Sequence, residues 1–312
     1  MRIIKPLVIV EDDLGMLMPN GYTQAQHMAK KIEFFARKCY KSEGKMTGDS
    51  HEKFLPGVFN TKRHTGIAEH RIISITFITD RGVSHEGLRH RMAAPYEFGA
   101  DPIETIESGG EAFLQESTRY CDYSGICKKC GGVGIGGELG FAPCPECPKN
   151  KGVTYILPPW VDMQVSFADN AVAFLGAQRF IQELKLDDER YARWRKWGWK
   201  PEQARYWLPQ GVKTEYAASL NLGSWWNFCV KRSPEAAHPQ MRQLAIPVLR
   251  YLQQHLPQFF GSVPFPAGAW HPSEEDAPEV KLFSHKGERY EEAKLVVNPF
   301  YDSVNFEEVY AA

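Results

Sequence analysis

Two arginine-rich segments stand apart in the first half of the chain, and a pair of cysteine knuckles follows the second. The first is 81–91, which ends in Arg89-His90-Arg91, and the second is 115–120, which contains Ser-Thr-Arg-Tyr. The residues between them and those around the cysteines are rich in Gly and Pro, which is typical of loops. We therefore expect an ordered loop with at most one short helix over 93–114, and a separate cysteine-containing segment over 125–152.

Composition predicts a folded protein with a net charge close to zero. In 312 residues, 43% are hydrophobic and 12% aromatic, which is ample for a core in one large or two small domains. The net charge of −1 gives no general attraction to nucleic acid or membranes. Any anion that the protein binds must therefore be held by a local cluster of basic side chains.

Cysteine use and hydropathy predict a cytoplasmic protein, in the host cytoplasm if the source is a virus. No apolar run approaches the roughly 18 residues that span a bilayer. The apolar start, 1–10, precedes three acidic residues and lacks a small-residue cleavage site, so we expect a strand there and no signal peptide. Four of the seven cysteines form Cys-x-x-Cys pairs, which indicates metal binding in a reducing compartment.

The two cysteine pairs predict a structural zinc site. Four thiolates at this spacing suit tetrahedral Zn²⁺ and leave no open position; the predicted ligands are Cys127, Cys130, Cys144 and Cys147. A redox pair, iron or a loop without metal are the alternatives, and nucleic-acid binding is not expected because few lysines accompany the cysteines. The remaining cysteines, Cys39, Cys121 and Cys229, are predicted to be small buried hydrophobic residues.

Apolar spacing predicts alternating helices and strands. Helices are expected over 23–40, 163–185 with a charged, Trp-rich continuation to 199, 222–230 and 240–256, and strands over 71–79 and 212–220. Ser84 is the expected N-cap of a helix that carries Glu86 and Arg89 on one face. The polar stretch 41–66 is predicted to be a loop, and the tail from Pro264 has no clear periodicity.

Five arginines in short polar contexts are candidates for phosphate binding: Arg89, Arg91, Arg119, Arg205 and Arg232. The planar guanidinium group offers two parallel, charge-assisted hydrogen bonds to phosphate. Most single arginines are solvated surface residues, so the sequence around each one decides its interpretation.

That sequence resembles the flavin-dependent thymidylate synthase family over about residues 22–257. The split motif resembles the family signature, Arg-His-Arg followed by Ser-x-Arg-Tyr. Further matches in the same order are 37–42, His64 to His70, 75–86, 156–159, Ala204 to Pro209, 213–232 and 237–245. The resemblance implies methylation of dUMP to dTMP, with methylenetetrahydrofolate as carbon donor and FAD carrying a hydride from NADPH.

The resemblance also implies residue roles. dUMP would be bound by Glu86, Arg89, Gln115, Glu116, Ser117, Thr118, Arg119, Arg205 and Arg232. FAD would be bound by Arg89, His90, Arg91, Gln115, Asn221 and Asn227. Catalysis is assigned to Arg232, Ser117 and His64, with Arg232 stabilising an anionic uracil and Ser117 acting as a ligand, since no dedicated base stands near it in sequence.

Three departures from the family pattern bear on the cofactor site. Gly66 stands where the family usually has Ser or Thr, Gly223 replaces a usual Arg, and Gln115 replaces a frequent Glu. The first removes a phosphate contact to FAD and the second a cofactor or phosphate contact, so the three departures support tight FAD binding less well than dUMP binding.

The sequence therefore predicts an α+β fold of the flavin-dependent thymidylate synthase type, with an inserted four-cysteine zinc ribbon. The family-like domain is expected over 1–260, interrupted relative to the family pattern by an insertion at 93–114 and a zinc-ribbon insertion at 125–152. A C-terminal extension is expected over 261–312. A homotetramer with shared active sites is implied by the resemblance alone. The alternatives are a related flavoenzyme that makes another 5-substituted pyrimidine nucleotide, or a non-catalytic homologue whose inserts bind protein or nucleic acid.

Overall fold

The computed structural model of the chain describes residues 1–91, 112–125, 152–161, 170–266, 281–297, 306 and 308–311. His90, Arg91, 170–176 and 308–311 are described by their backbone only. The predicted zinc ligands Cys127, Cys130, Cys144 and Cys147 lie outside these ranges, as does most of the first predicted insertion.

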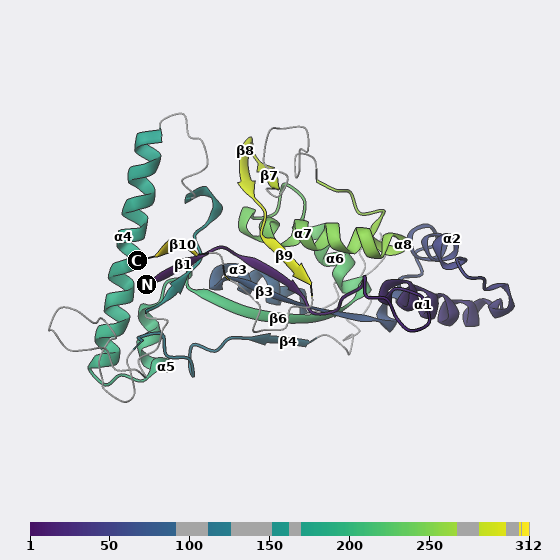
Figure 1. Cartoon of the computed structure of the whole chain (residues 1–312), viewed down its shortest axis with the longest axis horizontal. Coiled ribbons are helices and arrows are strands. Elements are labelled where there is room, and N and C mark those ends of the chain that lie inside the picture. Colours follow the sequence, from purple (N-terminus) through teal and green to yellow (C-terminus); the bar gives the residue numbers. More distant parts are fainter. Residues whose placement is uncertain are drawn as a thin grey trace, which may run out of the picture.

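A five-stranded mixed sheet forms the centre of the molecule, with strand order β4-β6-β3-β2-β9 (Figure 1). Its strands are β2 (Leu7–Val10), β3 (Ile72–Asp80), β4 (Ala112–Gln115), β6 (Lys213–Asn221) and β9 (Lys294–Val297). β3 and β6 pair antiparallel along their whole length, from Ile72 opposite Asn221 to Asp80 opposite Lys213. Residues 112–114, which the sequence assigned to an insertion loop, belong to the edge strand β4.

Helices pack on one face of this sheet and enclose the main core. They are α1 (Gln24–Tyr40), α3 (Arg81–Gly87), α6 (Leu222–Arg232), α7 (Pro239–His255) and α8 (Pro257–Phe260). Alternate strand residues such as Ile73, Ile75 and Phe77 point into this core, where Trp225 is fully buried. The Trp225 indole N–H donates to the Ile73 carbonyl at 2.9 Å, which satisfies its one polar group.

A second, smaller core lies where the chain ends meet (Figure 1). Strand β1 (Arg2–Ile4) pairs with β5 (Thr154–Tyr155) and with β10 (Glu308–Ala311). The long helix α4 (Asn170–Lys196) covers this sheet through Ile181, Leu184 and Tyr191. It continues without a break through the two stretches that the sequence divided at residue 185. The single first strand predicted over 1–10 is wrong, because the chain leaves one sheet after Ile4 and enters the other at Leu7 around Pro6.

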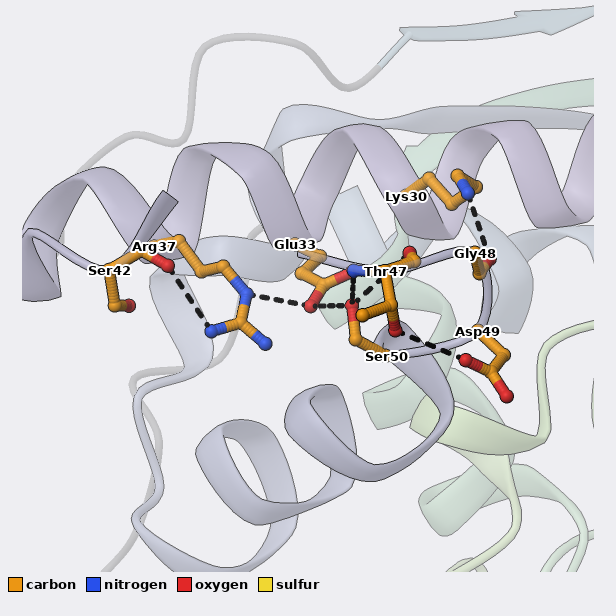
Figure 2. Close-up of polar contacts among 8 residues, drawn as sticks. All are labelled: Lys30, Glu33, Arg37, Ser42, Thr47, Gly48, Asp49 and Ser50. Atoms are coloured by element: carbon orange, nitrogen blue, oxygen red, sulfur yellow. Dashed lines mark hydrogen bonds and ion pairs between the residues drawn. The ribbon is translucent and has the colours of Figure 1, made fainter. Parts of the chain in front are cut away.

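The stretch 41–66 contains helices, so its prediction as a loop is wrong. Short helices α2 (His51–Pro56), η1 (Glu43–Lys45), η2 (Gly57–Thr61) and η3 (Thr65–His70) follow α1. A polar cluster holds α2 to α1: the fully buried Glu33 carboxylate accepts from Arg37 Nε and Ser50 Oγ, both at 2.7 Å (Figure 2). Some of the polar groups of this stretch bond to α1 within the fold, so polarity alone did not indicate a loop.

The C-terminal tail, unassigned from sequence, completes the fold. The hairpin β7 (Leu282–His285) and β8 (Glu288–Glu291) packs Phe283 and Tyr290 against Ile246 of α7. β9 then adds a parallel strand to β2 and covers that edge of the central sheet. The prediction of a mixed helix-and-strand fold is confirmed.

Candidate active site

Helix α3, which carries the first half of the split motif, starts one turn earlier than predicted. Its N-cap is Asp80, whose Oδ1 accepts from the Val83 backbone N–H at 2.9 Å. Asp80 Oδ2 accepts from Gln240 Nε2 at 2.5 Å, which ties α3 to α7. Burial raises the pKa of the Asp80 carboxyl, although hydrogen bonds from the Val83 and Gly82 N–H groups act in the opposite direction. The prediction of Ser84 as N-cap is wrong: Ser84 lies inside the helix, and its hydroxyl donates to the Arg81 carbonyl.

The two halves of the motif lie side by side although an insertion separates them in sequence. The Gln115 side chain on β4 donates from Nε2 to Ser84 Oγ on α3 at 2.7 Å. Arg81 Nη2 donates to the Glu116 carbonyl at 2.7 Å. Beyond α3, the turn η4 (Leu88–Arg91) carries the Arg-His-Arg sequence and packs against β4. The insertion therefore leaves the motif joined in space.

A short turn over 117–120 presents the second half of the motif. Arg205 Nη1 lies 3.5 Å from the Thr118 hydroxyl, and Arg119 Nε lies 3.1 Å from Glu202 Oε2. The Arg119 N–H donates to Ser117 Oγ at 3.2 Å. Arg119 is 61% exposed and Arg205 is also exposed, so both cations are accessible to a ligand.

Glu116 braces this turn. Its carboxylate accepts from Tyr123 Oη at 2.8 Å and from Lys213 Nζ at 3.2 Å. Burial, together with the neighbouring Glu116 charge, raises the pKa of the Tyr123 phenol, which therefore stays a hydrogen-bond donor at neutral pH. Because both Glu116 oxygens are bonded within the protein, the carboxylate holds the turn in place; its predicted contact with dUMP stays a prediction.

A second anchor connects the end of the turn to α4. Asp122 pairs with Arg195 through Oδ2–Nη2 and Oδ1–Nε distances of 2.5 and 3.1 Å. Burial acts to raise the pKa of the Asp122 carboxyl, but hydrogen bonds from Arg195 and Ser124 outweigh it and leave this pKa below its ordinary value. The Trp-rich end of α4 thus supports the site from outside, with Trp194 stacked on Trp207.

Arg232 joins the site from the end of α6. Arg232 Nη1 lies 3.2 Å from Glu86 Oε2, with side chains 23% and 32% exposed. The pair links two of the predicted nucleotide ligands across α3 and α6. Both remain partly open to solvent, so a ligand can reach the pair.

The predicted flavin residues lie on three elements: Asn221 and Asn227 at α6, Arg89 to Arg91 on η4, and Gln115 on β4. Asn221 is the N-cap of α6 and is buried, and its carboxamide oxygen accepts from the Ser224 N–H at 2.8 Å. Asn227 is half-buried on the same helix. His64 precedes η3, and its Nδ1 is hydrogen-bonded to the Tyr40 hydroxyl. Of the Arg-His-Arg sequence, only the Arg89 side chain lies within the described residues, and it is exposed.

Comparison with known proteins gives the family. The model of the family described as thymidylate synthase complementing protein matches residues 22–258. The chain belongs to this family, the FAD-dependent thymidylate synthases, which are methyltransferases. The match includes both halves of the split motif and ends within the last helix before the C-terminal tail.

One solved structure shares the fold of this family member. It is the flavin-dependent thymidylate synthase ThyX from Helicobacter pylori, complexed with FAD and dUMP, with a TM-score of 0.50 and 19% sequence identity. The match covers 83% of the present chain and 100% of the other. No curated protein sequence matches the chain at a significant level.

Four residues of the site were missed by sequence analysis. Arg81, Lys213 and Tyr123 brace the Glu116 turn, and Glu202 pairs with Arg119. Lys213 pairs with Asp80 at the last register position of β3 and β6, and Arg81 follows Asp80 directly. A correct pairing of those strands could therefore have brought Arg81 and Lys213 together. Glu202 and Tyr123 carry no local signal.

Two further findings concern the predicted cofactors and compartment. Among the described residues, no group of three or more His, Cys, Asp or Glu side chains is arranged to hold a metal ion. In the same part of the chain, no helix is both long and apolar enough to cross a bilayer. Cys229 is buried as predicted, Cys121 is intermediate, and Cys39 is exposed, so the prediction of a buried Cys39 is wrong.

Proposed function

We propose that this chain methylates dUMP to dTMP, using methylenetetrahydrofolate as the carbon donor and NADPH to reduce FAD. The observation that carries the proposal is that the two halves of the split motif lie in contact in the fold. The hydrogen bonds between Gln115 and Ser84 and between Arg81 and Glu116 hold the two halves together. Four of the predicted nucleotide cations, Arg89, Arg119, Arg205 and Arg232, belong to these and the adjoining elements.

Exposure suggests how the nucleotide would be bound. Arg119 and Arg205 lie at the exposed turn, where guanidinium groups can reach a phosphate. Arg232 lies deeper and would face the uracil. Loss of the N3 proton increases electron density at C5, and a nearby cation favours that anionic form by lowering its pKa. Ser117 would bind the nucleotide, since its hydroxyl already bonds with the Arg119 N–H within the turn.

The residues around α6 fit a flavin in kind. FAD, when bound and reduced, supplies the hydride that completes the methyl group. Exposed Arg89 can pair with a diphosphate, and the amides of Asn221 and Asn227 can hydrogen-bond to a ring or ribose. A Cβ built on Gly66 meets no atom within 4 Å. The hydroxyl that the family usually has there would therefore fit, and its absence is not forced by packing.

A mass-resolved product assay tests this function. Purified protein is given FAD, NADPH, methylenetetrahydrofolate and dUMP, and dTMP is expected only when all four are present. Arg205→Ala is expected to weaken dUMP binding, whereas Arg179→Ala, on an exposed part of α4, serves as the matched control. A product of another mass would indicate a related flavoenzyme. No product and no bound flavin would support a non-catalytic homologue.

We also propose that Cys127, Cys130, Cys144 and Cys147 bind one structural Zn²⁺. The support is their spacing, which suits four thiolates around a tetrahedral ion. Metal content by mass spectrometry is expected to give one zinc per chain, and Cys127→Ser with Cys144→Ser is expected to remove it. Cys39→Ser, which changes an exposed cysteine outside the pairs, should retain the zinc. An unchanged zinc content in the double variant would contradict the site.

A homotetramer is proposed as the working form. Large apolar side chains are exposed beside the nucleotide turn: Leu114 (76%), Tyr120 (76%) and Tyr206 (82%). A contiguous patch of exposed apolar side chains is typical of a protein–protein interface. Light scattering on purified protein is expected to give four times the chain mass, and Leu114→Asp should lower it. A monomer at every concentration would contradict the proposal.

A further inference from the structure

Tyr216 is a fully buried tyrosine whose hydroxyl has no hydrogen-bond partner among the described residues. It lies on β6 opposite Gln115 of β4, and its ring stacks on Phe77 with centroids 4.9 Å apart. Burial raises the pKa of its phenol, which therefore remains protonated. A buried donor without an acceptor is costly, so its retention in place of a phenylalanine needs a reason.

The phenol points at the end of α3, where Glu86 is placed. A Cβ built on Gly87 would lie 2.4 Å from Tyr216 Oη, so the oxygen occupies space that a side chain at 87 would need. Gly87 follows Glu86 directly, and Glu86 pairs with Arg232. Both of these charges act on the Tyr216 phenol. Tyr216 is thus a buried donor beside the helical turn that carries Glu86, whose ion pair with Arg232 we assign to the nucleotide site.

Nucleotide binding would change the hydrogen-bond donors that are available to the Glu86 carboxylate. If Arg232 contacts the nucleotide, as the proposed function requires, its guanidinium can no longer satisfy the Glu86 carboxylate fully. That carboxylate is only 32% exposed and would then stand beside an anionic ligand with too few donors. A phenol that already lies against the same helical turn can supply the missing hydrogen bond.

We propose that Tyr216 is a positioning residue that donates to the Glu86 carboxylate when Arg232 turns to the nucleotide. The assignment rests on the proposed function, because it requires dUMP at Arg232. The hydroxyl remains without an acceptor in the ligand-free protein and gains one in the complex. Stability without ligand and affinity for dUMP should therefore respond in opposite directions when the hydroxyl is removed.

The test is Tyr216→Phe, measured by thermal unfolding and by calorimetric titration of FAD-loaded protein with dUMP. We expect the ligand-free protein to unfold at an equal or higher temperature, and dUMP to bind about tenfold more weakly, since a hydrogen bond to a carboxylate is lost. The matched control is Tyr155→Phe. Tyr155 is also fully buried, with a hydroxyl that has no partner in the described structure, but it lies in the smaller core. Its change should leave dUMP affinity unaltered.

A double-mutant cycle with Glu86→Gln identifies the partner. In the Glu86→Gln background, Tyr216→Phe should change dUMP affinity less than about twofold, because the carboxylate that receives the hydrogen bond is absent. An unchanged affinity in Tyr216→Phe, or a tenfold loss that persists without Glu86, would overturn the assignment while dUMP binding by the wild-type protein upheld the proposed function. No dUMP binding by wild-type protein would overturn both.

Discussion

The molecule contains two glutamate–arginine pairs in contrasting surroundings. Glu33 and Arg37 lie one turn apart on α1, and Nε and Oε1 are separated by 2.7 Å. Glu33 is fully buried, and Ser50, the residue before α2, donates a second hydrogen bond to its Oε1 (Figure 2). Glu33 Oε2 has no hydrogen-bond partner among the described residues. Glu86 and Arg232 come from different helices, are separated by 3.2 Å and keep 32% and 23% of their side-chain surface exposed.

The difference shows how one chemical pair can serve structure or function. The buried pair cannot exchange partners with solvent or ligand, so it fixes α2 on α1. The partly exposed pair is open to solvent, and we propose that an anion can compete there for its arginine. Burial, more than residue type, therefore separates the two pairs.

Removal of the site arginine should produce the largest effect on turnover. Arg232→Ala is expected to lower dTMP formation by about 10³-fold, because a charge that stabilises the reacting uracil is lost. The free energy of unfolding should change by less than about 1 kcal/mol, since the pair is partly exposed. Steady-state product formation and urea unfolding measure the two. Retained turnover would show that the cation is not part of the chemistry.

Removal of the buried glutamate should have the opposite profile. Glu33→Ala leaves Arg37 buried without its carboxylate and is expected to lower the free energy of unfolding by about 3 kcal/mol. Folded protein should keep its turnover. The matched control is Glu183→Ala, which breaks the exposed i,i+4 pair with Arg179 at 3.4 Å and should cost about 0.3–0.5 kcal/mol. Equal losses in urea unfolding would remove the distinction drawn from burial.

A histidine makes the buried region sensitive to pH. His51 on α2 is 3% exposed, neither ring nitrogen has a partner among the described residues, and burial lowers the pKa of its imidazole below 6.5. The unfolded chain then binds the proton more readily, so stability from neutral His51 is complete above pH 6.5 and falls as the pH drops below it. His51→Phe should lose less stability than wild type between about pH 7.5 and about pH 5.5. Parallel acid profiles in urea unfolding would contradict this, and His27→Gln, at a less buried histidine, is the control.

The smallest expected effect is that of Gly66→Ser on FAD affinity. Gly66→Ser introduces a side chain where no atom lies within 4 Å, so stability should stay within about 0.5 kcal/mol. The added hydroxyl is expected to tighten FAD binding a few-fold through one new hydrogen bond, about 1 kcal/mol. Flavin fluorescence titration measures the affinity, and Gly66→Ala, which adds volume without a donor, is the matched control. Equal affinities in the two variants would exclude the contact.

Sequence periodicity predicted the long regular elements well. The helix over 23–40 and the strand over 71–79 match α1 and β3 closely, because each buries one face and its apolar spacing records that face. The helices at 41–66 were missed because their polar side chains bond to one another within the fold. The strands of the tail were missed because each is short and packs against elements that are distant in sequence, such as β2 or α7.

The sequence by itself determined the family, the positions of the arginines that we propose to bind the nucleotide, and the cysteine spacing, since these are local motifs. Only the tertiary structure decided that the two halves of the motif meet, that Glu116 braces its turn and that Tyr216 lies under Gly87. These contacts join residues that are distant along the chain and depend on the pairing of β4, β6 and β3. Strand register and helix packing determine such contacts, and neither can be predicted from the apolar spacing within a single segment.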